Sequence, residues 1–437
     1  MNKIIFHVDV NSAFLSWSAV NILRENPDAV DLRTIPSAVG GDVSSRHGII
    51  TAKSIPAKKY GIVTGEPVVK ALEKCPSLVL VKGDFTLYRE CSAAFIDILR
   101  EYGSVVEQVS IDEAFVDMTQ MCNCIRLESD NIEIADTAFR EVCVSIATTL
   151  KNEVRERLGF TVNVGISVNK LLAKMASDFE KPDKVHTLMP DEISNKMWPL
   201  PIGELFGCGK STAAALKNVG IRTIGDAAAM DMSILQGVLG NKAGEYIWRS
   251  ANGYGSDEVS DDVEQAKSYS NETTLPFDID ASNYSDKMPD ITERLAASVS
   301  RRMKRDGVFG NVVKVLIKTN EFKRHSKQIT IDEPTNDEEV IRTIGARLLD
   351  ELLMEDEDAI LKMGKAIRLV GVGCAGIDDG KYSQTSLFAW ADNKAAIEEK
   401  SANDAARREK TDKINAAIRI LKEKYGDDVI QHASQNE

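Results

Sequence analysis

Ser110 to Thr119 read S-I-D-E-A-F-V-D-M-T, and the organisation of the chain follows from this stretch. Apolar residues alternate up to Ile111 and resume at Phe115, which predicts two short strands joined in a hairpin. The acidic pair Asp112-Glu113 lies between them, although tight hairpin turns favour Asn-Gly or Asp-Gly because their backbone needs positive φ. Two adjacent like charges at a strand end also repel. A place where the local rule fails is a candidate functional site.

A third carboxylate precedes the first expected helix. Residues 3–10 read K-I-I-F-H-V-D-V, a strand whose apolar run breaks at Asp9, and Asn11 or Ser12 can cap a helix over about residues 13–24. Asp9 would then lie where a strand ends and a helix begins, a position suited to phosphate. Facing the acidic pair of the hairpin, it would help to hold hard divalent cations such as Mg²⁺. Taken singly, each acid could also be a solvent-facing strand-end or turn residue.

Composition places the chain among ordinary globular proteins, with 43% hydrophobic and 28% charged residues in a length of 437. No run reaches the roughly 18 apolar residues that span a bilayer, and an acidic residue by position 9 argues against a signal peptide. Seven scattered cysteines without a matched metal-binding pair predict reduced thiols in a bacterial-type cytoplasm. A net charge of −13 disfavours a generally basic nucleic-acid binder, but a basic segment over residues 294–327 can still contact phosphate locally.

Two motifs carry a resemblance to a known family. F-H-V-D-V-N-S-A-F at residues 6–14 and S-I-D-E-A-F-V-D at residues 110–117 are similar to the two catalytic motifs of the Y-family, or translesion, DNA polymerases, in particular the bacterial DNA polymerase IV branch. The resemblance implies an enzyme, a template-directed DNA polymerase of low fidelity that acts on damaged templates. Its substrates would be primer–template DNA and deoxynucleoside triphosphates, and it would work as a monomer.

The same resemblance implies roles for the residues of the first motifs. Asp9, Asp112 and Glu113 would hold two Mg²⁺ ions, together with the backbone carbonyl of Val10. Phe14 would stack under the deoxyribose and exclude a 2′-hydroxyl. Asp117, which closes the second motif, is expected to be structural.

The order of the expected elements defines an α+β, multidomain fold. The strand 3–10, a helix, the hairpin strands, a helix over 132–158 and a strand over 160–167 give a βαββαβ, ferredoxin-like sheet. A second βαββαβ pattern has strands near 267–274, 311–319, 325–331 and 367–375 and helices near 284–306 and 336–354. By resemblance, the palm comprises residues 1–24 and 81–185, the fingers 25–80, the helical thumb 186–254, a linker 255–265, the little finger 266–378 and a tail 379–437.

The fingers depart from the family pattern at the expected nucleotide site. Family members commonly read T-A-N-Y-x-A-R-K-F-G there, whereas this chain reads T-A-K-S-I-P-A-K-K-Y-G from residue 51. Lys58 would replace the arginine as a point charge without its bidentate fork. Ile55 stands where the tyrosine is expected, and Lys53 or Ser54 would compensate. After the last palm strand, Lys181 matches the family lysine that contacts the triphosphate.

Candidate DNA contacts lie in the thumb and the little finger. Gly207 and Gly209 precede a helix and resemble a helix-hairpin-helix element, whose backbone N–H groups approach a DNA phosphate closely. The basic segment supplies further candidates: Arg301, Arg302, Lys323, Arg324 and Lys327. Basic residues at a helix C-terminus also suit the helix dipole, so the two arginines have a structural explanation as well.

The tail contains a candidate docking peptide. Gln384, Leu387 and Phe388 lie in Q-T-S-L-F, residues 384–388, which resembles the peptide by which bacterial polymerases bind the sliding clamp. Packing of these apolar residues onto the protein's own surface is the alternative. A charged helix is expected after them, over about residues 393–425.

Three other functions remain compatible with parts of the sequence. A nucleotide cyclase on a similar palm would need neither the thumb glycines nor the basic segment. A non-catalytic DNA-binding or clamp-binding accessory would have lost a carboxylate, and all three are present. A catalytic subunit of the polymerase V type, active only with accessory proteins, stays open because of the variant fingers loop.

Overall fold

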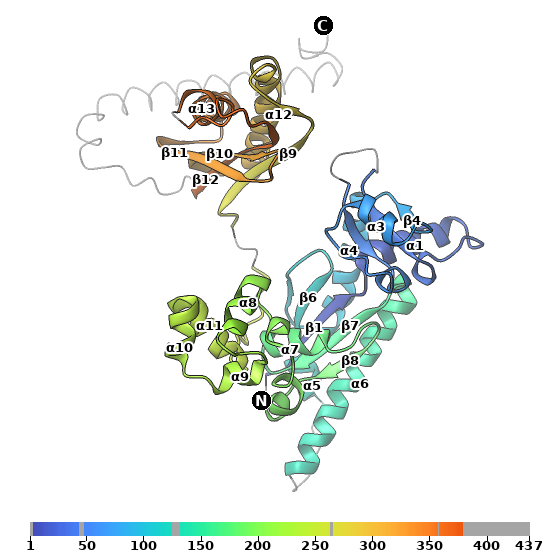
Figure 1. Ribbon diagram of the computed structural model, residues 1–437. Helices are drawn as coiled ribbons and strands as arrows, with labels where there is room; N and C mark the ends of the chain where they lie inside the picture. Colours follow the sequence, from blue (N-terminus) through green and yellow to red (C-terminus); the bar gives the residue numbers. More distant parts are fainter. Residues whose placement is uncertain (1–2, 43–47, 125–131, 263–264, 357, 379–437) are drawn as a thin grey trace, which may run out of the picture. The chain divides into compact units, whose positions relative to one another are not determined.

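The computed structural model describes residues 3–42, 48–124, 132–262, 265–356 and 358–378, and the chain divides into two units, residues 1–265 and 266–437. Each unit is built around its own sheet and core (Figure 1). Among the described residues, no helix is both long and apolar enough to cross a membrane. The predicted docking peptide 384–388 and the tail helix lie outside the described residues.

The first unit is organised around a five-stranded sheet. Its strands are β1 (Ile5–Val10), β5 (Val106–Gln108), β6 (Glu113–Asp117), β7 (Val162–Ser167) and β8 (Val185–Thr187), in the order β5-β6-β1-β7-β8. The predicted two-residue hairpin turn at Asp112-Glu113 was wrong, because Glu113 is the first residue of β6 and pairs with Asp9 across the strands. The turn instead spans residues 109–112, and Asp112 lies at its end.

Helices cover the two faces of this sheet differently. Alternate residues of β1 (Phe6, Val8, Val10) pack against α1 (Ala13–Glu25), α4 (Phe85–Tyr102) and α6 (Ile132–Leu158). The intervening residues face α7 (Lys170–Asp178), which lies so close to β7 that a side chain at Gly165 would collide with its backbone. Asp9 belongs to this second set, so α7 is the helix whose side chains reach it. The helix α4, which the sequence analysis did not anticipate, is capped by Asp84. A short helix, α5 (Thr119–Asn123), follows β6.

A small sheet and short helices form the segment between α1 and α4. Its elements are η1 (Leu32–Thr34), β2 (Ser37–Gly40), β3 (Ile50–Lys53), α2 (Ile55–Lys58), α3 (Val68–Lys74) and β4 (Val79–Val81), with strand order β3-β2-β4. Leu15 and Ala19 of α1 share a buried cluster with Val39 and Ala52, which fixes this segment against the helix that follows Asp9.

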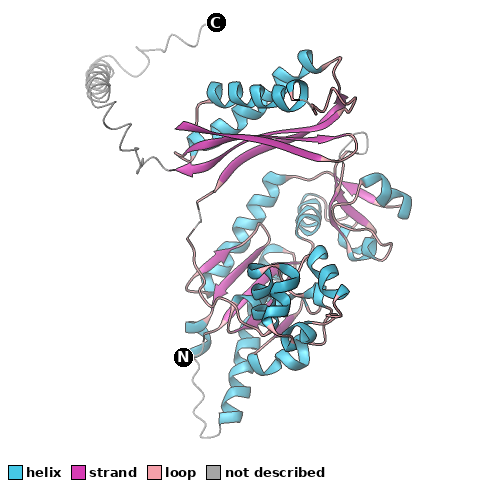
Figure 2. Cartoon of the chain, turned by 60° about the vertical axis from the view of Figure 1, so that its left-hand side comes forward, coloured by secondary structure: helices cyan, strands magenta, loops and turns pink. Residues whose placement is uncertain are grey.

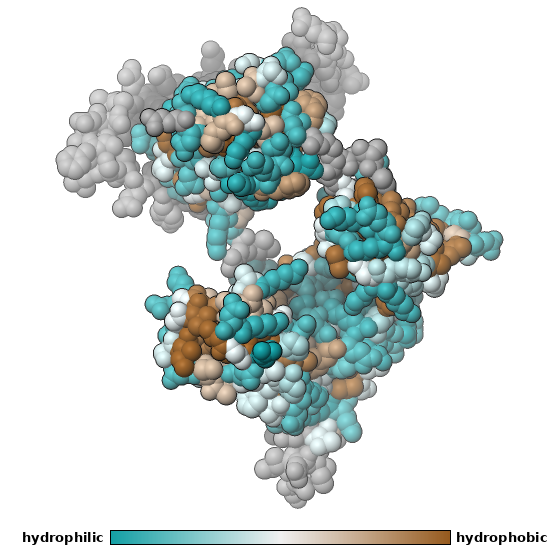
Figure 3. All heavy atoms as spheres, in the orientation of Figure 1, coloured by the Kyte–Doolittle hydropathy of each residue, from teal (hydrophilic) through white to brown (hydrophobic). Residues whose placement is uncertain are grey.

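The segment after β8 is helical, as predicted. It comprises η2 (Pro190–Glu192), η3 (Ile193–Met197), η4 (Ile202–Glu204), α8 (Lys210–Asn218), α9 (Ile224–Ala229), α10 (Met232–Leu239) and α11 (Asn241–Ala251) around one core. Apolar side chains also gather on the surface over α10 (Figure 3), where Ile234 is exposed.

The polar segment expected to be a linker is partly docked on the first sheet. Its Ser256 carbonyl accepts from the backbone N–H of Lys170, and the Ser260 N–H donates to Glu107 at 3.1 Å. Val259 is buried against Ile5 and other apolar residues of the sheet and α7. A single buried valine therefore anchors this segment, although its composition predicts a solvent-exposed linker.

The second unit has the predicted βαββαβ order. It contains β9 (Ser268–Ile279), α12 (Tyr284–Arg305), β10 (Phe309–Thr319), β11 (Arg324–Thr335), α13 (Glu338–Asp350), η5 (Glu351–Glu355) and β12 (Ile367–Asp378). The strand order is β11-β10-β12-β9, and both long helices cover one face of the sheet, as Figure 2 shows. The other face carries no helix from the described residues 265–356 and 358–378. β9 and β11 both run several residues further than the sequence pattern indicated.

Candidate active site

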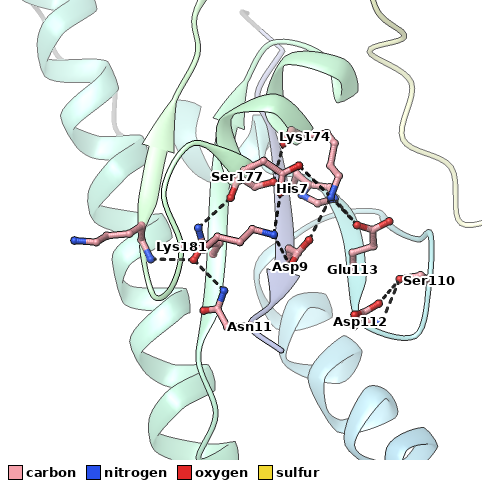
Figure 4. Close-up of polar contacts among 12 residues, drawn as sticks. His7, Asp9, Asn11, Ser110, Asp112, Glu113, Lys174, Ser177 and Lys181 are labelled. Atoms are coloured by element: carbon pink, nitrogen blue, oxygen red, sulfur yellow. Dashed lines mark hydrogen bonds and ion pairs between the residues drawn. The ribbon is translucent and has the colours of Figure 1, made fainter. Parts of the chain in front are cut away.

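The three candidate carboxylates meet where β1 ends and β6 begins (Figure 4). Asp9 is the penultimate residue of β1, and Glu113 lies opposite it in the antiparallel pair. Asp112 is held at the edge because its carbonyl accepts from the Val10 N–H at 2.9 Å. The sequence motifs that suggested these residues therefore converge, although they are about a hundred positions apart.

Two lysines compensate the charge of this acidic edge. Lys174 Nζ lies 3.2 Å from Asp9 Oδ2 and 2.8 Å from Glu113 Oε2. Lys181 Nζ lies 3.0 Å from Asp9 Oδ1 and 2.9 Å from Asp178. Burial acts to lower the pKa of Lys174, but the Asp9 carboxylate and the hydrogen bond to Glu113 outweigh it and raise the pKa. Both ammonium groups therefore stay charged and hold Asp9 in place.

Asp112 differs from its neighbours because no cation contacts it within the described residues. Its carboxylate accepts from Ser110 Oγ at 2.6 Å. Burial raises the pKa of Asp112, and the nearby charges of Asp9 and Glu113 add to the rise. Repulsion among three gathered carboxylates is the condition that a bound divalent cation relieves.

The donor set fits a hard divalent metal ion. It offers carboxylate oxygens and a backbone carbonyl, without sulfur. In the described part of the chain, no three Asp, Glu, His or Cys side chains form a ready metal cage. The Lys174 ammonium contacts two of the three acids and so occupies part of the space that a metal ion would need. Metal binding here would require this lysine to withdraw from Asp9 or Glu113.

His7 is a further part of the site, and the sequence analysis did not identify it. The ring is fully buried on the α7 face of β1, with Nδ1 2.8 Å from Ser177 Oγ and Nε2 3.5 Å from Glu113. Burial lowers the pKa of His7, which favours the neutral ring. The sequence did hold an indication of this role, because His7 lies two residues before Asp9 in β1 and therefore on the same face of the strand.

Two buried asparagines position the turn that carries Lys181. Asn163 donates to the carbonyls of Ser177 and Glu180, and it accepts from Asn11 Nδ2 at 3.1 Å. Asn11 Oδ1 in turn accepts from the Asp183 N–H at 2.9 Å. Asn11 therefore does not cap α1, and Ser12, the residue at the cap position, makes no capping hydrogen bond with its side chain either.

A cavity of about 550 Å³ opens between the carboxylate edge and the small sheet. Asp9, Asp112 and Lys181 line one side, and Lys53, Ile55 and Lys58 line another, with residues 10–16 of β1 and α1 between them. The remaining lining residues are Arg33, Thr51, Ala52, Ser54, Thr64, Thr161 and Pro182. The start of α1 lines the cavity, and the first N–H groups of a helix lack partners within the helix, which suits an anion.

Phe14 lies in this lining and is held by aromatic packing. Its ring stacks on Tyr88 with centroids 4.6 Å apart and an interplanar angle of 11°. Trp17 and Phe85 contact it at 5.9 and 5.8 Å. The hydroxyl of Tyr88 is hydrogen-bonded to Ser18, so the platform behind Phe14 is itself fixed.

Ser54 has a different role from the one considered for it. Its hydroxyl donates to the Ile35 carbonyl at 2.7 Å and accepts from the backbone N–H groups of Ala57 and Ser37. It is the cap of α2 and is buried. Lys53 is thus the residue of this pair that can offer a side chain to the cavity.

The two thumb glycines differ in their surroundings. Gly207 has φ +83°, and a side chain there would collide with Tyr246. Gly209 is the cap residue of α8, and an added Cβ would meet open space. A similar glycine that the sequence analysis missed, Gly240, joins α10 to α11 with φ +84° and open space beside it.

The basic segment of the second unit is divided among several surfaces. Arg324 lies on the face of β11 opposite α12 and α13, whereas Lys327, three residues on, binds Glu351 and Asp356 at 3.0 and 2.9 Å. Alternation along the strand separates them. Lys323 is exposed before β11. On α12, Arg301 is exposed, and Arg302 donates to the Ser270 carbonyl and stacks on Tyr269.

Comparison with known proteins gives the class to which these features belong. Residues 8–178 match the impB/mucB/samB family, residues 266–387 match its C-terminal domain, and residues 203–254 match the DNA polymerase-iota thumb domain. Among solved structures, a Y-family DNA polymerase chimera aligns with a TM-score of 0.70 at 22% identity, covering 86% of this chain and 99% of its own. A Dbh ternary complex aligns with a TM-score of 0.53 at 22% identity, covering 85% and 98%.

Bacterial relatives narrow the class. A protein named DNA polymerase IV from Clostridium acetobutylicum is 38% identical over 99% of this chain and 98% of its own length. DNA polymerase IV 1 from Bacillus subtilis is 32% identical over 89% and 86%. DNA polymerase IV from Alkaliphilus oremlandii is 31% identical over 99% of both chains.

The chain belongs to the impB/mucB/samB family, the Y-family of DNA polymerases. Within that family it is similar over its whole length to the bacterial DNA polymerase IV proteins. It is therefore a DNA-directed DNA polymerase of the translesion class, and the predicted fold class is confirmed. The cyclase and accessory-protein alternatives do not fit this membership. The family acts with divalent metal ions on DNA and nucleotide substrates.

Proposed function

We propose that the edge formed by Asp9, Asp112 and Glu113 carries the nucleotidyl transfer of this polymerase with two Mg²⁺ ions. The observation that supports it most is the convergence of the three acids at one edge, where Asp9 and Asp112 line a cavity whose opposite side is cationic. The Val10 carbonyl would complete the oxygen donor set. When bound, the ions lower the pKa of the primer 3′-hydroxyl and neutralise the triphosphate and the leaving pyrophosphate.

The surrounding side chains then position the reactants. His7 and Lys174 orient Glu113, and the asparagine pair holds the turn of Lys181 beside Asp9. Lys181 and Lys58 would contact the triphosphate as the metal-bound end of the substrate enters. Phe14 would lie flat beneath the deoxyribose, where its stacked ring leaves no room for a 2′-hydroxyl.

The remaining parts of the chain would hold DNA. We assign residues 1–24 and 81–185 to the palm, 25–80 to the fingers, 186–254 to the thumb, 255–265 to the linker and 266–378 to the little finger. Gly207 and Gly209 would present backbone N–H groups to phosphate, and Gly209 has the open space that this needs. Arg301, Arg302, Lys323 and Arg324 are the candidate contacts of the little finger. Lys327 has two acidic partners and would contribute least.

Primer extension by the purified chain alone tests this proposal. A labelled primer–template with the four deoxynucleoside triphosphates should be extended when Mg²⁺ is present and should not be extended in excess chelator. Adding Mg²⁺ back should restore synthesis. Failure to extend without added protein factors would favour the polymerase V type of dependence on accessory subunits, and failure with any factor would contradict the assignment.

We further propose that Gln384, Leu387 and Phe388 dock on a sliding clamp and that the polymerase is otherwise monomeric in a bacterial cytoplasm. All seven cysteines lie in the described part of the chain, and none forms a disulfide there, which supports a reducing compartment. Clamp tethering raises the local concentration of enzyme on DNA without changing its chemistry. Replacing Leu387 and Phe388 by alanine together should therefore spare extension by the bare enzyme and remove its stimulation by a loaded clamp. Equal stimulation of both proteins would refute the docking site.

A further inference from the structure

The cationic side of the cavity contains a lysine at a position where the family pattern has asparagine. Lys53, the last residue of β3, lines the cavity, and its Nζ donates to Thr64 Oγ1 at 3.2 Å. Lys58, at the end of α2, lines the same side and makes no ion pair or hydrogen bond through its side chain within the described residues. Both ammonium groups therefore face one opening.

No acid among the described residues pairs with either of these two charges. Burial lowers the pKa of Lys53, and the charge of Lys58 lowers it further, while Glu66 opposes both effects. Glu66 cannot supply a full counter-charge, because its carboxylate binds Lys74 at 2.6 Å and the Val63 N–H at 2.8 Å. Two cations that repel each other in a partly buried position favour an anionic ligand between them.

Other polar groups that line the cavity are already used in hydrogen bonds within the protein. The Arg33 guanidinium donates to both oxygens of Asp31 and to the Gly159 carbonyl, although it lines the cavity. The hydroxyl of Ser54 is used in capping α2. Among the described side chains on this side, Lys53, Thr64 and Lys58 are the ones that we consider for a ligand.

We infer that Lys53 and Thr64, beside Lys58, bind the terminal phosphates of the incoming nucleoside triphosphate. The inference rests on the proposed function, which puts the metal-bound part of the substrate at the carboxylate edge. The far end of the polyphosphate then points to the opposite side of the cavity. An ammonium and a hydroxyl that already contact each other can both donate to one phosphate group. This arrangement replaces the tyrosine hydroxyl and arginine fork that the family pattern has and this chain lacks.

Three variants test the inference. Lys53→Ala removes the charge, Lys53→Arg keeps it, and Lys59→Ala is the matched control, because Lys59 is exposed on the same short helix end and does not line the cavity. Steady-state primer extension gives kcat and KM for a deoxynucleoside triphosphate. Binding of the triphosphate and the corresponding diphosphate to the enzyme with primer–template and Ca²⁺ gives the contribution of the terminal phosphate.

Lys53→Ala should raise KM by about tenfold with a smaller change in kcat, as expected for loss of one charged hydrogen bond. Its preference for the triphosphate over the diphosphate should fall, Lys53→Arg should recover most of it, and Lys59→Ala should match the wild type. Equal KM and equal phosphate preference in Lys53→Ala and Lys59→Ala would overturn the inference. A wild-type enzyme that fails to extend primers would instead contradict the proposed function, and the binding comparison would still decide the role of Lys53.

Discussion

The two sides of the cavity each gather like charges, but they differ in whether side chains of the protein pair with those charges. On the side of β1, β6 and α7, Asp9 and Glu113 share Lys174, and Asp9 also binds Lys181. On the side of β3 and α2, Lys53 and Lys58 face the opening without an acidic partner among the described residues. Two of the three acids are therefore paired with internal cations, whereas the two lysines of the other side have no acidic partner in the part of the chain that the structure describes.

This difference indicates what each side binds. The acidic side is held in place by internal cations, so its carboxylates stay close together in the absence of metal, and a bound ion has to compete with an ammonium group. The cationic side has no such counter-charge in the part of the chain that the structure describes, and an anion would complete it. A metal–polyphosphate substrate, positive at one end and negative at the other, complements both sides at once.

Removing a carboxylate from the acidic side should reduce the rate of primer extension more than any other substitution considered. Replacing Asp112 or Glu113 by alanine takes away a proposed metal ligand, and metal-assisted stabilisation of the transition state contributes several kcal/mol, so extension should fall by about a thousandfold or more. Primer–template affinity, measured by fluorescence anisotropy, should change little because the proposed phosphate contacts lie elsewhere.

Asp117→Asn is the matched control on the same strand. Asp117 pairs with Lys3 at 2.7 Å and accepts from the Thr119 N–H, away from the cavity. The Asp117→Asn substitution should lower thermal stability and leave the extension rate close to that of the wild type. Near-normal extension by both alanine variants would show that the acidic side is not the catalytic one.

Phe14 lies between the two sides, and its replacement should relax the choice of sugar. Phe14→Val opens space beneath the ribose while the Tyr88 platform remains, so incorporation of ribonucleotides should rise relative to deoxynucleotides by about 10–200-fold. Single-nucleotide insertion with each nucleotide type measures this ratio. The metal requirement should not change, because neither side has lost a charged group. Unchanged discrimination would limit Phe14 to a packing role.

Replacing Ser54 should affect stability without affecting nucleotide binding on the cationic side, and we expect this variant to have the smallest effect on extension of those considered. Ser54→Ala deletes the cap of α2 and should cost about 1 kcal/mol of stability. Thermal denaturation measures this loss, and Ser54→Thr should recover part of it. The KM for nucleotide should stay at the wild-type value, in contrast to Lys53→Ala. A raised KM at unaltered stability would mean that the serine hydroxyl contacts the substrate.

The sequence analysis was most successful where the information is local. Alternation along strands and the spacing of helices predicted both βαββαβ patterns, and the order of the elements along the chain follows from them. The hairpin turn was misplaced, since it spans residues 109–112 and Glu113 already belongs to β6, where Lys174 pairs with it. The helix α4 was missed, although Asp84, which caps it, stands directly before it in the sequence.

By itself, the sequence determined the class of fold and the candidates Asp9, Asp112, Glu113 and Phe14, because motifs and periodicity are properties of neighbouring residues. Only the tertiary structure decided which charges meet. Lys174 reaches Asp9 across 165 positions, and the choice between Lys53 and Ser54 depends on a bond from Ser54 to Ile35. The faces of Arg324 and Lys327 likewise follow from which side of the second sheet the helices cover. Neither sequence motifs nor periodicity indicate which distant residues will be in contact. These contacts, and the chemistry that depends on them, could therefore be assigned only from the folded structure.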